Sequence, residues 1–202
     1  MKIICIGRNY ADHAAEMNAA LPTDPVFFLK PDTAILSQED FYYPSFTKEI
    51  HYECELVVKI SKMGKHIDSK FASKYYHQVS LGIDFTARDL QANCKAKGLP
   101  WEIAKAFDQS AVISKRWISI TPEEIQNLSF SFYQNGELKQ HGNPSMMLFN
   151  IDEIIAYISK FITLKTGDLI FTGTPAGVGP ITIGDELVGV LNGEEMYRIQ
   201  IK

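Results

Sequence analysis

The sequence has few cysteines and no long apolar run. Its 202 residues include only Cys5, Cys54 and Cys94, an odd number at wide spacings that fits neither a disulfide framework nor a zinc ribbon. No uncharged stretch approaches the roughly 20 apolar residues of a membrane span, and the apolar run after Met1 is too short for a secretory signal. We therefore expect a cytoplasmic protein without a membrane partner, in which residue 1 belongs to the fold.

The sequence also lacks an excess of basic residues. Lysine and arginine together number 20, against 24 for aspartate and glutamate, and the two signs are interspersed. Proteins that bind nucleic acid carry a basic patch or stripe, so this balance predicts no nucleic-acid partner. It is compatible with a small ligand, including an anionic one.

No internal repeat, low-complexity segment or linker divides the chain. With 46% hydrophobic residues, a chain of this length can bury a substantial core without disulfides or a structural metal. The sequence therefore predicts one domain over residues 1–202.

Strand patterns outnumber helix patterns. Helices are predicted at residues 10–17, 69–76, 86–97 and 151–161. Strands are predicted at 3–6, 53–60, 79–84 and 169–171, in a hairpin of 128–133 with 138–140 across Asn135–Gly136, and in a final pair of 186–190 with 196–201. Extended chain and turns are predicted at residues 31–44, and an irregular segment is predicted at 101–107. Strands and helices do not alternate regularly, so we expect a mixed α+β, mostly β fold with a few covering helices.

Two carboxylates share one face of a predicted strand. Glu53 and Glu55 are two residues apart, so their side chains point to the same side while Cys54 points to the other. Asp84 ends an apolar strand, where an unpaired charge would be costly. Three carboxylates without cysteine or histidine suit a hard divalent cation, Mg²⁺ or Mn²⁺. The alternative for the glutamate pair is a solvated, exposed strand face.

A second group of residues suggests acid–base chemistry. His13 and Glu16 stand three residues apart on the first predicted helix, so they share a face, and an imidazole held by a carboxylate is a general base that activates water near neutral pH. The alternative is a histidine beside a glutamate on the surface. Lys105 has apolar neighbours, where its charge needs a partner, although most lysines are solvated.

The glycine-rich loop 172–180 lacks the pattern of a phosphate-binding loop and that of a dinucleotide-binding loop. One interpretation is a tight turn between strands. The other is a set of backbone N–H groups that, with the Thr174 hydroxyl, holds a carboxylate.

Six ordered segments that span nearly the whole chain carry the most characteristic patterns. They are residues 6–13 with Glu16, 28–31, 51–56, 82–89, 98–105, and 172–175 with 177–179. Together they resemble the fumarylacetoacetate hydrolase family, particularly its short members that act as acylpyruvate hydrolases and oxaloacetate decarboxylases.

The resemblance implies a mostly β fold with a roll-like core, a homodimer, and a Mg²⁺ or Mn²⁺ ion on Glu53, Glu55 and Asp84. It implies that His13 and Glu16 form a water-activating dyad on a lid, residues 10–24, that orders over bound substrate. It also implies that Lys105, a third catalytic residue beside His13 and Glu16, and Thr174 contact a small 2-oxo-carboxylate substrate. The further substrate-binding residues that we predict are Arg8, Gln91 and Gly173.

The activity implied is hydrolysis of a C–C bond in acylpyruvates such as acetylpyruvate or fumarylpyruvate. Oxaloacetate decarboxylation passes through the same enolate and is expected beside it. The alternative among enzymes is an isomerase, hydratase or decarboxylase of open-chain dienoates. The alternative from another class is a non-catalytic protein that holds a metal and a dicarboxylate, against which the His13–Glu16 pair argues, because a passive binder needs no water-activating dyad.

Overall fold

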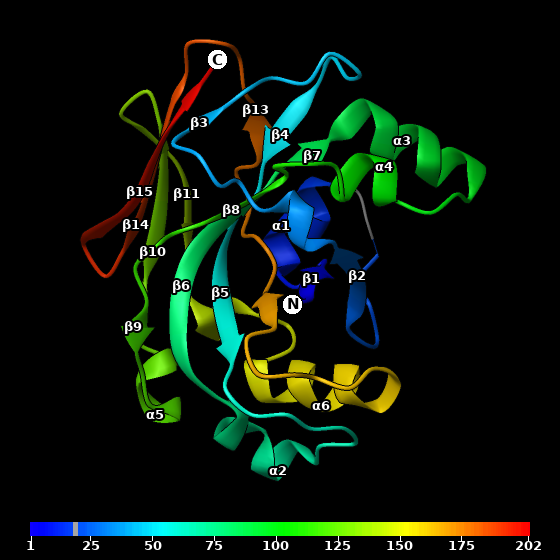
Figure 1. The fold of residues 1–202 in the computed structure, drawn as a ribbon, viewed down its shortest axis with the longest axis vertical. Coiled ribbons are helices and arrows are strands. Elements are labelled where there is room, and N and C mark those ends of the chain that lie inside the picture. Colours follow the sequence, from blue (N-terminus) through cyan, green and yellow to red (C-terminus); the bar gives the residue numbers. More distant parts are fainter. Residues whose placement is uncertain (18–19) are drawn as a thin grey trace.

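The computed structural model describes residues 1–17 and 20–202, and β-sheets make up most of it (Figure 1). The largest sheet contains β1 (Ile3–Gly7), β2 (Val26–Lys30), β5 (Cys54–Ile60), β6 (Tyr76–Asp84), β8 (Ala111–Ile113), β9 (Ile118–Ser119) and β12 (Leu169–Phe171). Its order is β2-β1-β12-β5-β6-β8, with β9 also paired to β6. The pairing of β1 with β12 is parallel and the others are antiparallel. This mixed arrangement confirms the predicted fold class.

Two smaller sheets complete the β structure. The second sheet contains β3 (Asp40–Phe41), β10 (Phe130–Gln134), β11 (Glu137–Gly142), β14 (Glu186–Leu191) and β15 (Glu194–Ile201), in the order β11-β10-β14-β15-β3. The third contains β4 (Ile50–Tyr52), β7 (Thr86–Ala87) and β13 (Gly179–Pro180), in the order β13-β4-β7. The predicted hairpin is the β10–β11 pair, and positive φ angles of 54° at Asn135 and 78° at Gly136 confirm its tight turn.

Short helices lie at the two ends of the long strands β5 and β6 (Figure 1). The helices are α1 (Ala11–Glu16), α2 (Ser69–Ala72), α3 (Arg88–Lys97), α4 (Glu102–Lys105), α5 (Pro122–Ile125) and α6 (Ile151–Phe161), with 3₁₀ turns at Asp32–Ala34, Ser73–Tyr75 and Pro144–Met146. In the view of Figure 1, α2 and α6 cover the lower end, while α3 and α4 stand beside the upper end. In the described part of the chain, no helix has the length and apolarity that a membrane crossing requires.

The alternation of β5 separates an apolar face from an acidic one. Leu56 and Val58 are fully buried in the main core, which also includes residues of the second sheet such as Phe132 and Leu187. Val57, on the opposite face, belongs to a smaller apolar cluster beside β1 and β12. The two glutamates share this second face, which therefore faces the interior as well. They cannot be the solvated pair that the sequence left as an alternative.

Two predicted helices need correction. The helix predicted from residue 86 begins at Arg88, because Thr86–Ala87 pair with β4 as a strand. The helix predicted over residues 69–76 ends earlier, as α2 and a 3₁₀ turn, because Tyr76 pairs with Ile60 as the first residue of β6. In both places sheet pairing outweighs local helix propensity.

The predicted irregular segment, residues 101–107, contains a helical turn. The N–H groups of Ala104 and Lys105 both donate to the Trp101 carbonyl at 2.9 Å. One turn is too short to show a hydrophobic period in the sequence. The expected lid includes residues 18–19, which lie outside the described residues.

Helix α6 allows a stability test away from the acidic face. Ile155 is fully buried on its apolar stripe, so Ile155→Ala should lower the free energy of unfolding by about 2–5 kcal/mol through lost burial and the cavity that remains. Urea denaturation followed by circular dichroism measures this. Ile183→Ala is the matched control, because Ile183 is 71% exposed. Equal unfolding midpoints for the two variants would contradict the assigned core.

Candidate metal and catalytic centre

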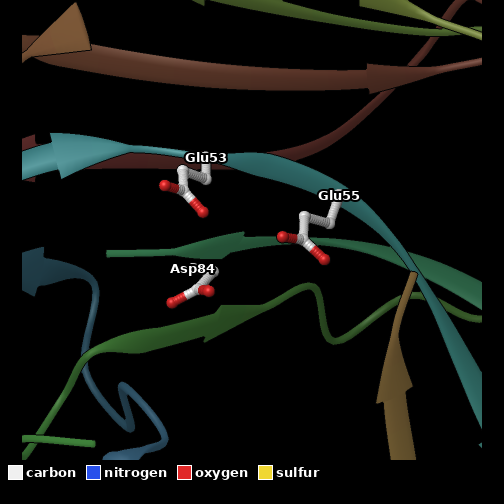
Figure 2. Close-up of side chains that lie close together, drawn as sticks. All are labelled: Glu53, Glu55 and Asp84. Carbon is white, nitrogen blue, oxygen red and sulfur yellow. The ribbon is translucent and has the colours of Figure 1, made fainter. Parts of the chain in front are cut away.

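Three carboxylates meet where β5 and β6 pair. Glu55 lies opposite Gly82 in the strand register, and the Asp84 N–H donates to the Glu53 carbonyl at 2.8 Å. Oxygens of the three side chains lie within 4.8 Å of one another. Figure 2 shows the side chains of Glu53, Glu55 and Asp84 turned toward the same space. The structure thus brings together the three predicted metal ligands.

Lys105 bridges two of these carboxylates. Its Nζ donates to Glu53 Oε2 at 2.7 Å, to Asp84 Oδ2 at 2.8 Å and to Thr86 Oγ1 at 2.5 Å. These contacts use all three protons of the ammonium group. Burial disfavours the charge, but Asp84 and Glu53 outweigh it and raise the pKa of Lys105. Lys105 therefore stays charged and holds the two acids in place.

Lys30 stands on the other side of Asp84. Its Nζ lies 2.8 Å from Asp84 Oδ1 and donates to Ser110 at its carbonyl, 3.1 Å away, and its Oγ, 2.9 Å away. It also donates to the Lys105 carbonyl. The side chain is completely buried, so Lys30 serves as an internal counter-ion and an anchor for α4.

Arginine and lysine side chains form a positive wall of the same cavity. Arg88 donates to Glu53 Oε1 at 2.8 Å and to Gln91 Oε1 at 2.7 Å. Arg8 and Lys95 also line the cavity. Arg8 has a φ of 60°, which is uncommon for a residue other than glycine and is typical of strained functional positions.

Glu55 differs from its two neighbours because no cation lies within ion-pair distance of it among the described residues. The Gly173 N–H donates to its Oε2 at 2.7 Å. Burial, reinforced by Asp84 and Glu53, raises the pKa of Glu55 well above its usual value. Burial also opposes the charge of Glu53, but the lysine and the arginine beside it outweigh burial and lower the pKa of that carboxyl.

This donor set fits a hard divalent cation. All the facing ligand atoms are carboxylate oxygens, the class that Mg²⁺ and Mn²⁺ prefer. Within the described residues, Asp84 Oδ1 makes no hydrogen bond despite the nearby Lys30 ammonium, so it keeps acceptor capacity. A divalent cation would also compensate the charge of Glu55. Glu53, Glu55 and Asp84 are therefore the residues that would hold the metal.

The predicted dyad lies in the same cavity. His13 Nδ1 is 3.0 Å from Glu16 Oε2, and the Gly177 N–H donates to Glu16 Oε1 at 3.1 Å. His13 is 8% exposed and lines the cavity with the three carboxylates. An ionised carboxylate only accepts hydrogen bonds, so Nδ1 carries the proton and Nε2 is left as the basic nitrogen.

Comparison with known proteins identifies the family of this site. A sequence profile of the fumarylacetoacetate (FAA) hydrolase C-terminal family matches residues 2–200. The chain belongs to the fumarylacetoacetate hydrolase family. This confirms the resemblance on which the sequence analysis relied.

Relatives within the family are named for reactions of 2-oxo acids. The chain is 43% identical over 205 residues to the mitochondrial oxaloacetate tautomerase of Bos taurus, covering 99% of this chain and 91% of the relative. It is 41% identical over 185 residues to the mitochondrial oxaloacetate decarboxylase of Dictyostelium discoideum, covering 91% and 85%. Fumarylpyruvate hydrolase from Pseudomonas aeruginosa, solved in complex with Mn²⁺ and pyruvate, superposes with a TM-score of 0.90 at 35% identity, covering 100% of this chain and 89% of the other.

The predicted substrate-binding residues differ in which of their polar groups are free to bind a ligand. Arg8, Gln91, Lys105 and Thr174 line the cavity. The Thr174 hydroxyl donates to a backbone carbonyl, that of residue 54, at 2.9 Å, so in this arrangement it offers a ligand only an acceptor. The Gly173 N–H already donates to Glu55, one of the three predicted metal ligands Glu53, Glu55 and Asp84, which are called the metal triad below.

Sequence reasoning missed the parts played by Lys30, Arg88 and Thr86. A charge count would have helped, because three buried carboxylates require buried cations close by. Lys30 ends an apolar run, and Arg88 follows Asp84 by four residues. Either position is a plausible source of such a cation, but spacing alone does not show which acid it reaches.

The ligand assignment is tested most cleanly at Glu55, because no cationic side chain among the described residues pairs with it. Glu55→Gln keeps an oxygen for the Gly173 N–H but removes the charge, so the dissociation constant for Mn²⁺ should rise at least about tenfold. Isothermal titration calorimetry measures it. Glu186→Gln, an isosteric change on β14, should leave the constant unchanged. Wild-type Mn²⁺ affinity in Glu55→Gln would remove Glu55 from the ligand set.

Proposed function

We propose that this protein is a Mg²⁺- or Mn²⁺-dependent enzyme of small 2-oxo acids, and that its main reaction is hydrolysis of the C–C bond of an acylpyruvate. The observation that supports this most strongly is the His13–Glu16 pair beside the three carboxylates in one cavity. A positioned base next to a hard-cation site suits attack of water on a chelating keto acid. The names of the relatives refer to the same class of compound.

The charge of the site favours a dianionic substrate. Its centre holds three carboxylates and three cationic side chains, namely Glu53, Glu55, Asp84, Lys30, Lys105 and Arg88. Their formal charges cancel, so a bound divalent cation would leave a net charge of about +2. Arg8 and Lys95 add positive charge at the wall. Fumarylpyruvate and oxaloacetate, with two carboxylates each, match this balance.

Each group at the centre has a defined task. When bound, the cation supplies a Lewis acid that polarises the 2-oxo-carboxylate end of the substrate and stabilises negative charge on its enolate. Lys105 holds Glu53 and Asp84 in their positions and keeps positive charge next to the reacting atoms. Arg88 and Lys95 attract the anionic substrate into the cavity.

His13 moves the proton in hydrolysis. Its Nε2 accepts a proton from water while Glu16 holds Nδ1–H and stabilises the imidazolium. The water oxygen attacks the distal carbonyl carbon, and the bond between that carbon and the pyruvate methylene then breaks. The electron pair leaves with pyruvate as its enolate, which takes a proton to give pyruvate. One acylpyruvate and one water thus yield pyruvate and a carboxylic acid.

Oxaloacetate chemistry is the second candidate, supported by the 43% identity to an oxaloacetate tautomerase. Keto–enol tautomerisation moves one proton between the C3 carbon and the keto oxygen, a transfer within the capacity of the His13 imidazole. Decarboxylation breaks the bond to the C4 carboxylate and leaves the same pyruvate enolate, without an attacking water. Both reactions need the positive centre, and only tautomerisation needs the base.

The first experiment compares acetylpyruvate, fumarylpyruvate and oxaloacetate with Mn²⁺ or Mg²⁺ and again after chelation. Metal-dependent release of pyruvate from an acylpyruvate is the expected result. Turnover of oxaloacetate alone would contradict hydrolysis as the main reaction and favour the second candidate. If none of the three reacts, dienoates are tested next. Tight oxalate binding without any turnover would identify a binding protein instead.

If the His13–Glu16 pair is the base, one substitution should separate acylpyruvate hydrolysis from oxaloacetate decarboxylation. Glu16→Gln removes the charge that supports the His13 imidazolium, so acylpyruvate hydrolysis should fall by about 10²–10⁴-fold. Oxaloacetate decarboxylation, which needs no water-activating base, should fall less than about tenfold. Pyruvate and carbon dioxide release measure the two rates, and Mn²⁺ affinity should stay at the wild-type value. Undiminished hydrolysis would exclude the dyad from the mechanism.

A further inference from the structure

One short loop orients a carboxylate of the metal triad and the carboxylate of the dyad. In the loop of residues 173–177, the Gly173 N–H donates to Glu55 Oε2 at 2.7 Å and the Gly177 N–H donates to Glu16 Oε1 at 3.1 Å. The other Glu16 oxygen holds His13. A shift of this loop would therefore disturb the metal ligand and the base together.

Gln140, a residue of the second sheet, holds the middle of this loop. It lies on β11 and is 1% exposed. Its Nε2 donates to Thr174 Oγ1 at 2.7 Å and to the Pro175 carbonyl at 2.8 Å, while its Oε1 accepts from the Cys54 N–H at 2.9 Å. The amide has one possible orientation, because turning it over would set its NH₂ group against the Cys54 N–H and its oxygen against the Pro175 carbonyl.

The same contacts fix the residue between two metal ligands. Thr174 Oγ1, which Gln140 holds, donates its own proton to the Cys54 carbonyl at 2.9 Å. Gln140 and Thr174 together thus bind both backbone polar groups of Cys54. Glu53 and Glu55 flank this residue in the sequence. Gln140 therefore reaches the triad along two routes, through the loop and through the strand.

The loop is also seated sterically on β11. Gly177 has a φ of 98°, and a Cβ atom built on it would lie 2.1 Å from the Lys139 carbonyl oxygen. The backbone of residue 177 is thus packed closely against the backbone of Lys139, the residue before Gln140. Hydrogen bonds and close packing both tie the loop to this one strand.

We propose that Gln140 is a positioning residue of the active centre, which acts through the 173–177 loop on Glu55 and Glu16. It is not one of the residues that line the cavity, so its role is to position them. The statement about catalysis rests on the proposed function, whereas the effect on metal affinity does not. Substitution of a group that orients a metal ligand through hydrogen bonds typically lowers metal affinity or activity by about 10–100-fold.

The test compares Gln140→Met with wild type. Methionine fills similar space but makes none of the three hydrogen bonds, so kcat at saturating Mn²⁺ should fall about 10–100-fold and the Mn²⁺ dissociation constant should rise about tenfold, with KM within about threefold. Calorimetry and steady-state kinetics well below the melting temperature measure these values. Gln200→Met is the matched control, because Gln200 lies in the same sheet and, among the described residues, its side chain donates to Glu186, away from the loop. The values of this control should equal those of wild type.

A second variant covers the case in which Gln140→Met fails to fold. Gln140→Glu is isosteric, but its buried carboxylate cannot donate to Pro175 or Thr174 until it is protonated. Burial raises the pKa of such a carboxyl, so the ratio of variant to wild-type kcat should rise as pH falls from about 8 to about 6. Circular dichroism at each pH checks that the variant is folded, and in folded protein a merely structural role would give a ratio independent of pH.

The outcomes separate this proposal from the proposed function. If kcat and the Mn²⁺ dissociation constant of Gln140→Met stay within about twofold of wild type while its melting temperature falls, Gln140 is only structural and the proposal is wrong. If wild-type protein turns over no 2-oxo acid, the proposed function fails. The Mn²⁺ dissociation constant of Gln140→Met is then the only test of the positioning role. Weakened binding then supports the positioning role, and unchanged binding overturns it.

Discussion

The burial of three carboxylates at the junction of β5 and β6 is the constraint on which the rest of the site depends. Isolated ionised carboxylates in a protein interior cost far more free energy than a folded domain can spare, so cations must lie beside them. Lys30, Lys105 and Arg88 meet this need from three separate elements, β2, α4 and the start of α3. The charge balance therefore fixes where these elements sit around the acidic face.

The ion pairs reach only two of the three carboxylates among the described residues, and a metal ion could bind beside the third. Among the described residues, Glu55 has a backbone N–H beside it but no cation within ion-pair distance, which distinguishes it from the two other acids. A hard divalent cation would complete the compensation there and leave excess positive charge for a dianionic 2-oxo acid. The arrangement that folding requires, with cations around buried acids, thus also suits the proposed substrate.

The position of His13 explains how one centre could serve several related reactions. An enolate of a 2-oxo acid is common to acylpyruvate hydrolysis, oxaloacetate decarboxylation and oxaloacetate tautomerisation. The reactions differ in what a base must do. Hydrolysis needs a base that takes a proton from water, tautomerisation needs one that takes a proton from carbon, and decarboxylation needs none. The His13–Glu16 pair is held by the same loop that holds Glu55, so the proposed base and the proposed metal ligand are aligned by shared contacts.

The sequence by itself determined whatever depends on local geometry. Strand alternation set Glu53 and Glu55 on one face, helical spacing set His13 beside Glu16, and Asn135–Gly136 set a tight turn. Tertiary structure alone decided that the acidic face is buried, that Lys105 donates to Glu53 and Asp84, and that Gln140 holds the loop. Such contacts join residues 21 to 118 positions apart, and local periodicity carries no information about partners at those distances.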